Sequence, residues 1–321
     1  MRYVILGAGA IGGAIGGRLF QHGCDVVLVA RGEHLRMLQS NGLELRDPDA
    51  TVVLPVPAVG TAAAAGLRPD DVVVLATKSQ HSEALLAELA LAAPPEIAVV
   101  CAQNGVENER IAARRFASVY GMRVILPGRH LEPGVVGIAT GPAWGILDIG
   151  RYPAGTDAVA EKIAADLRAS GFDAQATARV MARKYLKLLG NVGNAVEAAC
   201  GPGRHPVADQ LRAAATAEAM ACYQAAGIEV ADRAEDAARR RGMNRSAERG
   251  TTEGGSSWQS LQRQTGNIEA DWLNGEIVLL GRLHGVATPV NERLQAVANR
   301  MASENAPPGS IRADELAAGL L

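Results

Sequence analysis

The glycine-rich turn near the N-terminus constrains the fold of this chain more than any other stretch. An apolar run at residues 3–6 precedes it, and a segment with helical spacing and a second apolar run at residues 26–30 follow it. The turn comprises Gly7, Ala8, Gly9, Ala10, Ile11 and Gly12. In a strand–turn–helix unit the first glycine permits the turn, the second admits a pyrophosphate, and the third lets helix and strand pack closely. Glycines also serve ordinary turns, but the flanking pattern favours a dinucleotide site at these six residues.

The residue that ends the second predicted strand indicates which nicotinamide cofactor binds. NAD enzymes usually carry an acidic residue there, which binds the ribose hydroxyls. This chain carries Arg31, which suits a 2′-phosphate through charge-assisted hydrogen bonds. NADP(H) is therefore favoured over NAD(H). The alternative is a solvated surface arginine, and the nearby Glu33 keeps that alternative open.

Two further apolar runs, at residues 71–77 and 97–101, are typical of parallel strands that are covered on both faces. They end at Lys78 and at Asn104, which Gly105 follows. Ligands of open parallel sheets lie beyond the carboxyl ends of the strands, so both side chains are predicted at the cofactor crevice. The alternatives are a surface lysine and a turn asparagine.

Shorter elements complete the first half of the chain. Residues 41–59 predict edge strands, 61–67 a short helix, 119–149 antiparallel additions to the sheet, 156–170 a helix and 171–176 a last strand. From Ala178 onward the periodicity is almost entirely helical. We therefore predict an α/β protein with a Rossmann-type dinucleotide-binding domain at residues 1–177 and an all-helical domain at residues 178–321.

Composition excludes several classes of partner. The 32 basic and 34 acidic residues give a net charge of −2, and aromatic residues make up only 3%, which predicts no nucleic-acid or membrane surface. No apolar run approaches the ~18 residues of a membrane span, and no leader precedes the first strand. The four cysteines are far apart, so neither a metal site nor a disulfide framework is expected. We expect a cytoplasmic protein that acts on small molecules.

A polar stripe marks the start of the second domain. On a continuous helix, Asn191 lies about 40° and Asn194 about 20° from Lys187 around the axis, so the three side chains share one face. A buried lysine and two buried amides need partners or a ligand. The alternatives are an exposed face or hydrogen bonds between domains.

Two later segments are also polar. Residues 233–249 include Arg239, Arg240 and Arg241, and they are predicted to be a solvated helix face or a mobile segment rather than an anion site. Gly254-Gly255-Ser256-Ser257 precede an element that begins at Trp258. A serine there is usually an N-cap, although a hydroxyl with free N–H groups also receives a carboxylate.

Taken together, these pieces resemble the ketopantoate reductase (2-dehydropantoate 2-reductase) family over nearly the whole chain. The order and spacing of the pieces carry the resemblance. They are the glycine turn, Lys78, Asn104-Gly105, Lys187-Leu188-Leu189-Gly190-Asn191, Ser256-Ser257, Glu269 and Asp271 before Leu273-Asn274-Gly275, and residues 284–291.

The resemblance implies an NADPH-dependent reduction of a 2-oxo acid in a cleft between a Rossmann domain and a helical domain. It implies that Lys187 donates the proton, that Asn104, Asn191 and Ser257 hold the substrate, and that Glu269 lies at the same site. The chemistry agrees, because hydride arriving at carbon leaves charge on oxygen, which a nearby cation stabilises and protonates.

The sequence departs from the family pattern at two positions. The second helix asparagine of the family falls on Ala195, and an acidic residue falls on Leu261. The resemblance places both at the substrate end distal to the carbonyl, where Asn194 could substitute. Ketopantoate is therefore the first substrate expected, with another branched or bulky 2-oxo acid second and a non-catalytic NADP(H) sensor third. The alanine-rich helical domain also makes a homodimer plausible.

Overall fold

The computed structural model describes residues 1–130, 132–141, 143–243 and 254–321. The chain divides into two compact units. Unit 1 contains residues 1–104, residues 108–184 and a third segment that begins at Asp232. Unit 2 contains residues 105–107, residues 185–231 and the C-terminal part through Leu321. The boundary predicted after residue 177 falls inside the segment of unit 1 that ends at Lys184.

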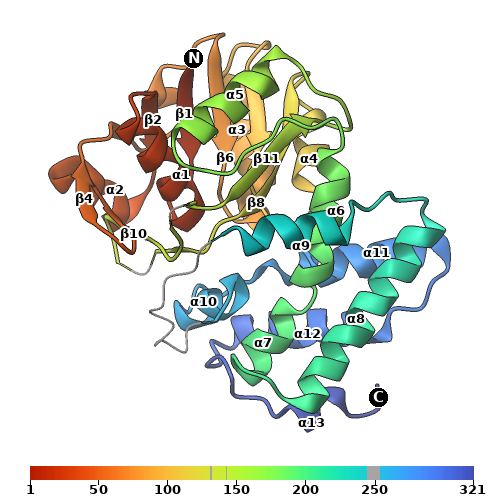
Figure 1. Ribbon diagram of the computed structural model, residues 1–321. Helices are drawn as coiled ribbons and strands as arrows, with labels where there is room; N and C mark the ends of the chain where they lie inside the picture. The colour runs from red at the N-terminus through yellow and green to blue at the C-terminus, as the bar shows by residue number, and fades with distance from the viewer. Residues whose placement is uncertain (131, 142, 244–253) are drawn as a thin grey trace. The chain divides into compact units, whose positions relative to one another are not determined.

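Unit 1 is built around a seven-stranded sheet in the order β11-β8-β7-β6-β1-β2-β5 (Figure 1). Its strands are β1 (Arg2–Leu6), β2 (Asp25–Val29), β5 (Ala58–Val59), β6 (Asp71–Leu75), β7 (Ala98–Cys101), β8 (Val119–Ile125) and β11 (Ile146–Arg151). All neighbours are parallel except β11, which runs antiparallel to β8. The predicted Rossmann-type α/β fold is confirmed.

A second sheet of four strands has the order β4-β3-β10-β9. It comprises β3 (Leu43–Arg46), β4 (Thr51–Leu54), β9 (Gly128–Arg129) and β10 (Val135–Ile138). The prediction that residues 119–149 only add antiparallel strands to the main sheet is therefore wrong. The helix α4 (Asn108–Ala113) carries the chain back so that β8 pairs parallel with β7, as a helical crossover does.

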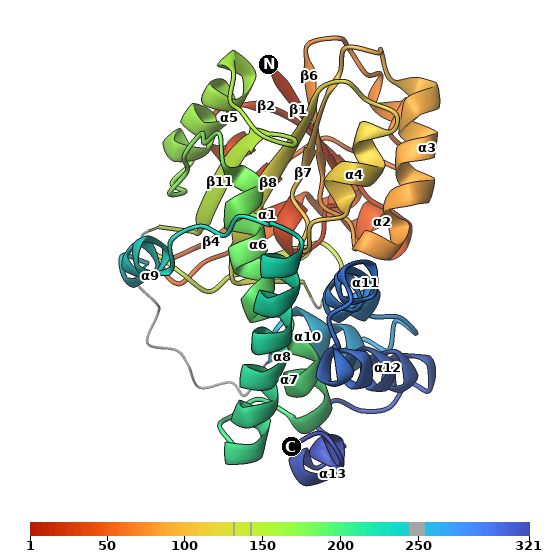
Figure 2. The same ribbon diagram turned by 90° about the vertical axis from the view of Figure 1, so that its right-hand side faces the viewer.

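Helices cover both faces of the main sheet, and Figure 2 shows α5 (Ala158–Ala169) on one side with α3 (Ser82–Ala92) and α4 on the other. The remaining helices of unit 1 before residue 170 are α1 (Ala10–Gln21) and α2 (Gly32–Asn41), with short 3₁₀ turns η1 (Ala63–Ala65) and η2 (Ser79–His81). Successive β1 residues point to opposite faces. Tyr3 and Ile5 join one buried core, and Val4 and Leu6 join the other.

Three local predictions differ from the structure. The helix expected at residues 61–67 is only the single turn η1, which ends at Gly66 with φ +59°. The strand expected at 171–176 makes only two isolated bridges, Ile146 with Asp173 and Ile149 with Ala176. The helix α2, which starts directly after Arg31, is not among the elements expected from the sequence.

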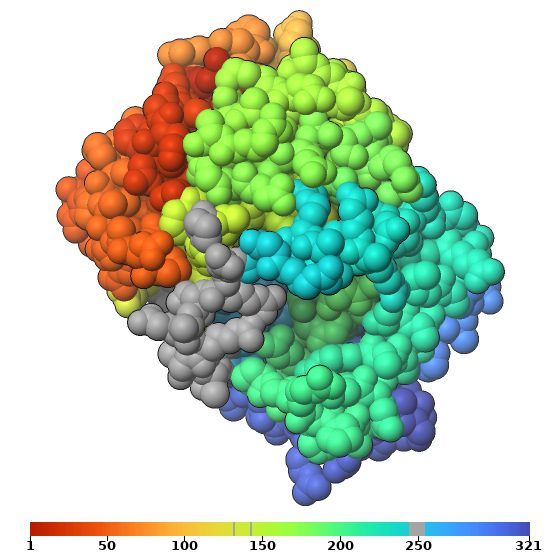
Figure 3. Space-filling model, in the orientation of Figure 1, coloured from red at the N-terminus to blue at the C-terminus, as the bar shows by residue number. Residues whose placement is uncertain are grey.

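The charged segment that follows residue 232 forms helix α9 (Arg233–Arg241), and this helix belongs to unit 1. Arg239 pairs with Asp148 at 2.8 Å and with Asp173 at 2.8 Å. Figure 3 shows α9, in cyan, against the green part of unit 1. The prediction of a solvated helix face is therefore wrong for Arg239, because the buried Asp148 and the partly exposed Asp173 attract it, while Arg241 is exposed. Residues 244–249 of the predicted segment lie outside the described residues.

The described residues of unit 2 form helices and their connections. The helix α6 (Val180–Asn191) enters this unit at Tyr185. The others are α7 (Asn194–Cys200), α8 (Pro206–Ala225), α10 (Ser256–Gln262), α11 (Asn274–His284), α12 (Pro289–Ser303) and α13 (Ala313–Ala317), with the 3₁₀ turn η3 (Glu269–Trp272). Small buried residues such as Ala215 and Ala219 let α8 pack closely. None of the helices within the described ranges combines the length and apolar character that a membrane span requires.

Candidate functional site

The register of the central strands brings three turns together at one edge of the sheet. Leu6 of β1 pairs with Val29 of β2 and with Leu75 of β6. Because the three strands are parallel and end in register, the residues that follow them emerge side by side. The glycine turn, Ala30-Arg31 and Ala76-Thr77 therefore meet at the carboxyl edge, where ligands of this fold bind.

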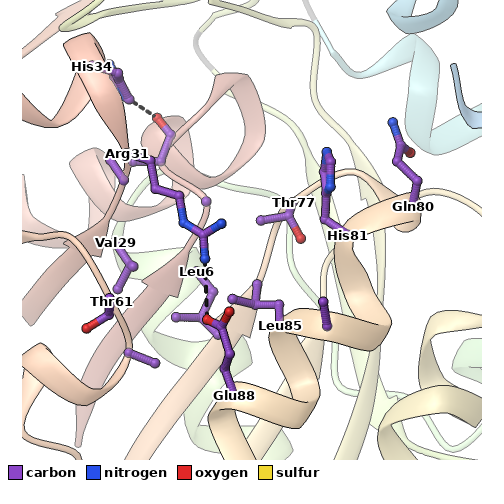
Figure 4. A pocket seen from close by; sticks show the side chains of 15 residues that line it. Leu6, Val29, Arg31, His34, Thr61, Thr77, Gln80, His81, Leu85 and Glu88 are labelled. Atoms are coloured by element: carbon purple, nitrogen blue, oxygen red, sulfur yellow. Dashed lines mark hydrogen bonds and ion pairs between the residues drawn. The ribbon is translucent and has the colours of Figure 1, made fainter. Parts of the chain in front are cut away.

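A cavity of about 470 Å³ opens at this edge within unit 1 (Figure 4). The strand ends and α3 supply most of its walls. It is lined by Leu6, Gly7, Ala8, Val29, Ala30, Arg31, His34, Thr61, Ala62, Thr77, Gln80, His81, Ala84, Leu85 and Glu88. The sequence assigns a role to three of these, Gly7, Ala8 and Arg31. The structure thus places predicted cofactor residues from two strand ends around one cavity.

The first and third glycines of the turn occupy positions where a side chain would collide with the rest of unit 1. Gly7 has φ +99°, and a Cβ there would lie 2.7 Å from Thr77 Cγ2. A Cβ on Gly12 would overlap the Gly7 carbonyl oxygen and lie 2.8 Å from Ile5 Cγ2. Helix α1 follows with no side-chain cap from the described residues and no acidic residue in its first turn. Its first N–H groups suit an anion, so the turn fits the pyrophosphate of a dinucleotide.

Arg31 extends from the end of β2 toward Glu88 of α3, and Figure 4 shows the two side chains meeting beside the cavity. Their ion pair measures 3.3 Å between Arg31 Nη2 and Glu88 Oε2, with the side chains 70% and 55% exposed. The guanidinium is thus both at the cavity, as predicted, and solvated, as in the alternative interpretation. Glu88 is a partner that the sequence does not suggest.

Lys78 and Asn104 follow adjacent strands, since Leu75 of β6 pairs with Cys101 of β7. A buried hydrogen-bonded network joins the two connections. Ser82 Oγ donates to Asn108 Oδ1 at 2.6 Å, and Gln103 Nε2 donates to Ser82 Oγ at 2.7 Å. Asn108 Nδ2 also donates to the Asn104 carbonyl at 3.3 Å. This network fixes the Asn104 backbone at the edge where the sequence predicts ligand contacts.

In unit 2, Lys187 and Asn191 lie one helical turn apart at the end of α6. Both are half-buried, while Leu188 and Leu189 are buried. The carboxamide oxygen of Asn191 is buried and accepts no hydrogen bond from the described residues. A buried acceptor without a donor is costly in a folded protein. The Asn191 oxygen therefore suits a ligand that supplies a donor.

The single helix that we predicted through Asn194 is instead two helices. Helix α6 ends at Asn191 and α7 begins at Asn194, with Val192 and Gly193 between them. The argument that Asn194 shares a face with Lys187 on one continuous helix is therefore wrong. Glycine weakens the helix at this point, and a remote polar group stabilises the break.

That polar group is Asn274, the first residue of α11. Its Nδ2 donates to the Val192 carbonyl at 2.9 Å and to Asn291 Oδ1 at 3.0 Å. Asn291 in turn donates to Glu218 Oε2 at 2.8 Å. Asn274 and Asn291 are 1% and 0% exposed. These two buried asparagines, which belong to the segments that resemble the family, therefore stabilise the break between α6 and α7 through their hydrogen bonds.

Ser257 and Glu269 are both buried in unit 2. Helix α10 starts at Ser256 with Gly255 as its N-cap, so Ser257 lies within the helix and the usual N-cap interpretation is wrong. Burial lowers the pKa of the Arg263 guanidinium, and the Glu269 charge opposes that shift.

The structure thus groups the predicted residues by unit. Unit 1 gathers Gly7, Ala8 and Arg31 around one cavity, and it places Lys78 and Asn104 after neighbouring strands. Sequence reasoning missed the cavity residues His34, Thr77 and Glu88. In the sequence, His34 is marked only by its position three residues after Arg31. That position suggests a place at the cavity only once it is known that α2 begins directly after Arg31.

Comparisons with known proteins agree with this arrangement. Two family models for ketopantoate reductase PanE/ApbA match the chain, one over residues 3–154 and the C-terminal one over residues 179–302. The 2-dehydropantoate 2-reductase of Halobacterium salinarum is 29% identical over 312 residues, which cover 90% of this chain and 95% of that protein.

Solved structures share the fold. A PanE/ApbA family ketopantoate reductase from Ralstonia eutropha is 26% identical with a TM-score of 0.81, covering 95% of this chain and 99% of that chain. A D-mandelate dehydrogenase solved with NADH and anilino(oxo)acetate has the same fold, at 24% identity, a TM-score of 0.80 and the same coverage. The chain therefore belongs to the ketopantoate reductase PanE/ApbA family of oxidoreductases.

Proposed function

We propose that this protein reduces a 2-oxo acid to the 2-hydroxy acid with NADPH, and that 2-dehydropantoate is its substrate. The observation that carries the proposal is the position of Lys187 one helical turn before Asn191, whose buried carboxamide oxygen has no donor among the described residues. A cation one turn from an unsatisfied acceptor suits a substrate that carries both a carbonyl oxygen and a hydroxyl donor more than it suits a structural role. The names of the relatives supply the substrate class.

Residues of unit 1 would hold the cofactor. The turn is open at Gly9, where the nearest atom to an added Cβ would be His130 Cδ2 at 3.9 Å, and no side chain of the described residues caps the N–H groups that follow, which suits a pyrophosphate. Arg31 would bind the 2′-phosphate of NADPH, and Lys78 and Asn104 would complete the cofactor set. When bound, the reduced nicotinamide supplies the hydride.

Residues of unit 2 would carry the rest of the chemistry. Lys187 would stabilise the charge that develops on the carbonyl oxygen and give it a proton. Asn191, Asn194 and Ser257 would hold the substrate together with Asn104 of unit 1, and Glu269 would lie beside it.

Two buried apolar residues bear on which 2-oxo acid the protein reduces. Ala195 and Leu261, which replace polar residues of the family pattern, are 4% and 3% exposed. The fold alone does not select the acid, because a D-mandelate dehydrogenase shares it. A different branched or bulky 2-oxo acid is therefore the second candidate, favoured by these two apolar side chains.

A panel of 2-oxo acids tests the proposal. We expect 2-dehydropantoate to give the highest kcat/KM with NADPH, compared with the analogue that lacks its terminal hydroxyl and with an aromatic 2-oxo acid. Polar sites reject analogues that lack a matching hydroxyl strongly, while apolar sites discriminate weakly. Faster turnover of the hydroxyl-free analogue would replace the substrate and keep the reaction class. Binding of NADPH without turnover of any acid would indicate a sensor.

The proposal also includes a cytoplasmic location and a homodimer. All four cysteines are free thiols, as expected in a reducing compartment. Leu279 and Leu283 of α11 are 43% and 66% exposed, which supports a contact between copies through that helix.

A further inference from the structure

A histidine of α2 contacts the glycine turn directly. His34 Nε2 lies 2.8 Å from the Ala8 carbonyl oxygen, and Figure 4 shows this bond at the edge of the cavity. On the other side of the ring, the Gly134 N–H donates to His34 Nδ1 at 2.8 Å. The ring therefore joins the turn before α1 to the connection between β9 and β10.

The two partners determine where the proton of His34 lies. A carbonyl only accepts and a backbone N–H only donates, so Nε2 carries the proton and Nδ1 is bare. Both bonds form together only in the neutral ring, because a protonated Nδ1 would face the Gly134 N–H. Burial lowers the pKa of His34, the charge of His130 lowers it further, and the Ala8 carbonyl opposes both.

The surroundings of the ring hold it in place. His130 is the titratable group that faces it, with ring centroids 4.3 Å apart, and His130 Nδ1 lies 3.0 Å from the Val135 carbonyl oxygen. Gly134 has φ +82°, and a Cβ there would lie 2.9 Å from the Cβ of Met37 in α2. The β9–β10 connection thus packs against α2 where His34 accepts its bond.

The bond to Ala8 has a consequence for the next residue. The Ala8 carbonyl and the Gly9 N–H belong to one planar trans peptide, in which they point in opposite directions. Fixing the carbonyl toward His34 therefore fixes the Gly9 N–H away from it. Gly9 is the N-cap of α1, the position at which a backbone N–H meets an anion in this fold.

We infer that His34 is a positioning residue for the cofactor: its Nε2–H holds the Ala8–Gly9 peptide so that the Gly9 N–H faces the pyrophosphate. This inference rests on the proposed dinucleotide function. It assigns His34 no hydrogen bond to the cofactor, since both of its ring nitrogens are used by the protein.

Two isosteric variants separate the two bonds. In His34→Gln the amide nitrogen can replace Nε2–H toward Ala8, whereas in His34→Asn the amide oxygen can replace Nδ1 toward Gly134. We expect His34→Gln to bind NADPH and NADH within about twofold of the parent. We expect His34→Asn to weaken both cofactors by about three- to tenfold, the usual range for one hydrogen bond. The loss should be equal for the two cofactors because both carry the pyrophosphate.

Thermal unfolding and a control variant complete the test. His22→Asn removes a ring that bonds the Arg18 carbonyl at the other end of α1, and it should leave affinity unchanged. If His34→Gln and His34→Asn lose affinity equally, or in proportion to their loss of Tm, the histidine is only structural and the inference is overturned.

A measurement without cofactor distinguishes this failure from that of the proposed function. In the ¹⁵N-histidine NMR spectrum of the free parent, the signals that His34→Gln removes should show a neutral Nε2–H ring. An Nδ1–H or charged ring at neutral pH would overturn the inference whatever the protein binds. A parent that binds neither NADPH nor NADH would instead overturn the proposed function.

Discussion

Arg31 already has an anionic partner, and the strength of that pairing determines how well a phosphate can replace it. An exposed ion pair such as Arg31–Glu88 contributes about 0 to 1 kcal/mol. A bidentate bond from arginine to phosphate contributes about 1.5 to 3 kcal/mol. A 2′-phosphate should therefore displace Glu88, whereas the ribose hydroxyl of NADH should not.

Arg31→Ala should accordingly weaken NADPH by about tenfold or more and leave NADH within about twofold. Glu88→Gln, which keeps the shape of the partner and removes its charge, should strengthen NADPH and leave NADH unchanged. Fluorescence titration of both cofactors measures these changes. Equal losses of NADPH and NADH in Arg31→Ala would remove this residue from the phosphate site.

Lys187 is the residue on which the proposed chemistry depends most. Its charge is needed when the oxyanion forms, so its loss should appear in turnover rather than in cofactor affinity. Lys187→Ala should lower kcat by about 10² to 10⁴, the usual contribution of a positioned proton donor, with NADPH binding nearly unchanged. Lys162→Ala, on the exposed surface of α5, is the control in the same steady-state assay. A Lys187→Ala rate within a few-fold of the parent would show that another group supplies the proton.

At the scale of elements, Asp148 of β11 connects three parts of unit 1. This carboxylate is fully buried and pairs with Arg123 of β8 at 3.2 Å, with Arg183 of α6 at 3.0 Å and with Arg239 of α9 at 2.8 Å. Asp236, on α9, adds a further ion pair with Arg123. The strand pair at the sheet edge and two helices therefore depend on one buried negative charge.

Asp148→Ala should lower the free energy of unfolding by about 3 to 5 kcal/mol, because it leaves buried arginines without their carboxylate. Asp314→Ala is the matched control, since it removes an exposed partner of Arg312 and should cost less than about 1 kcal/mol. Urea unfolding of both variants gives the comparison. A loss below about 1 kcal/mol for Asp148→Ala would mean that Asp173 and Asp236 are sufficient partners for the arginines.

The elements that could be predicted from the sequence are those whose cause is local. The unit from β1 through the glycine turn to β2 follows from an apolar period and three glycines within one stretch. The break between α6 and α7 could not be predicted in this way, because the group that stabilises it is Asn274, far along the chain. The pairing of β8 with β7 likewise depends on the α4 crossover rather than on the strand's own residues.

The same distinction holds for the whole molecule and for its site. Family, fold class and the residues of the glycine turn were accessible because order and spacing along the chain express them. The places of His34 and Glu88 at the cavity could not be predicted from the sequence, since they depend on which connections the sheet brings together. The place of α9 in unit 1 was hidden for a similar reason: Arg239 appears solvated until Asp148 and Asp173 are known to face it.

The discontinuity of unit 1 affects how the protein is made. A ribosome releases the chain from its N-terminus, and domains generally fold as they emerge. All strands of the main sheet are available once Arg151 has left the ribosome, yet the third arginine around Asp148 is residue 239. Synthesis must continue through α6, α7 and α8 before that arginine arrives. Unit 1 is therefore the first to begin folding during translation, but it cannot finish folding until part of unit 2 has been synthesised.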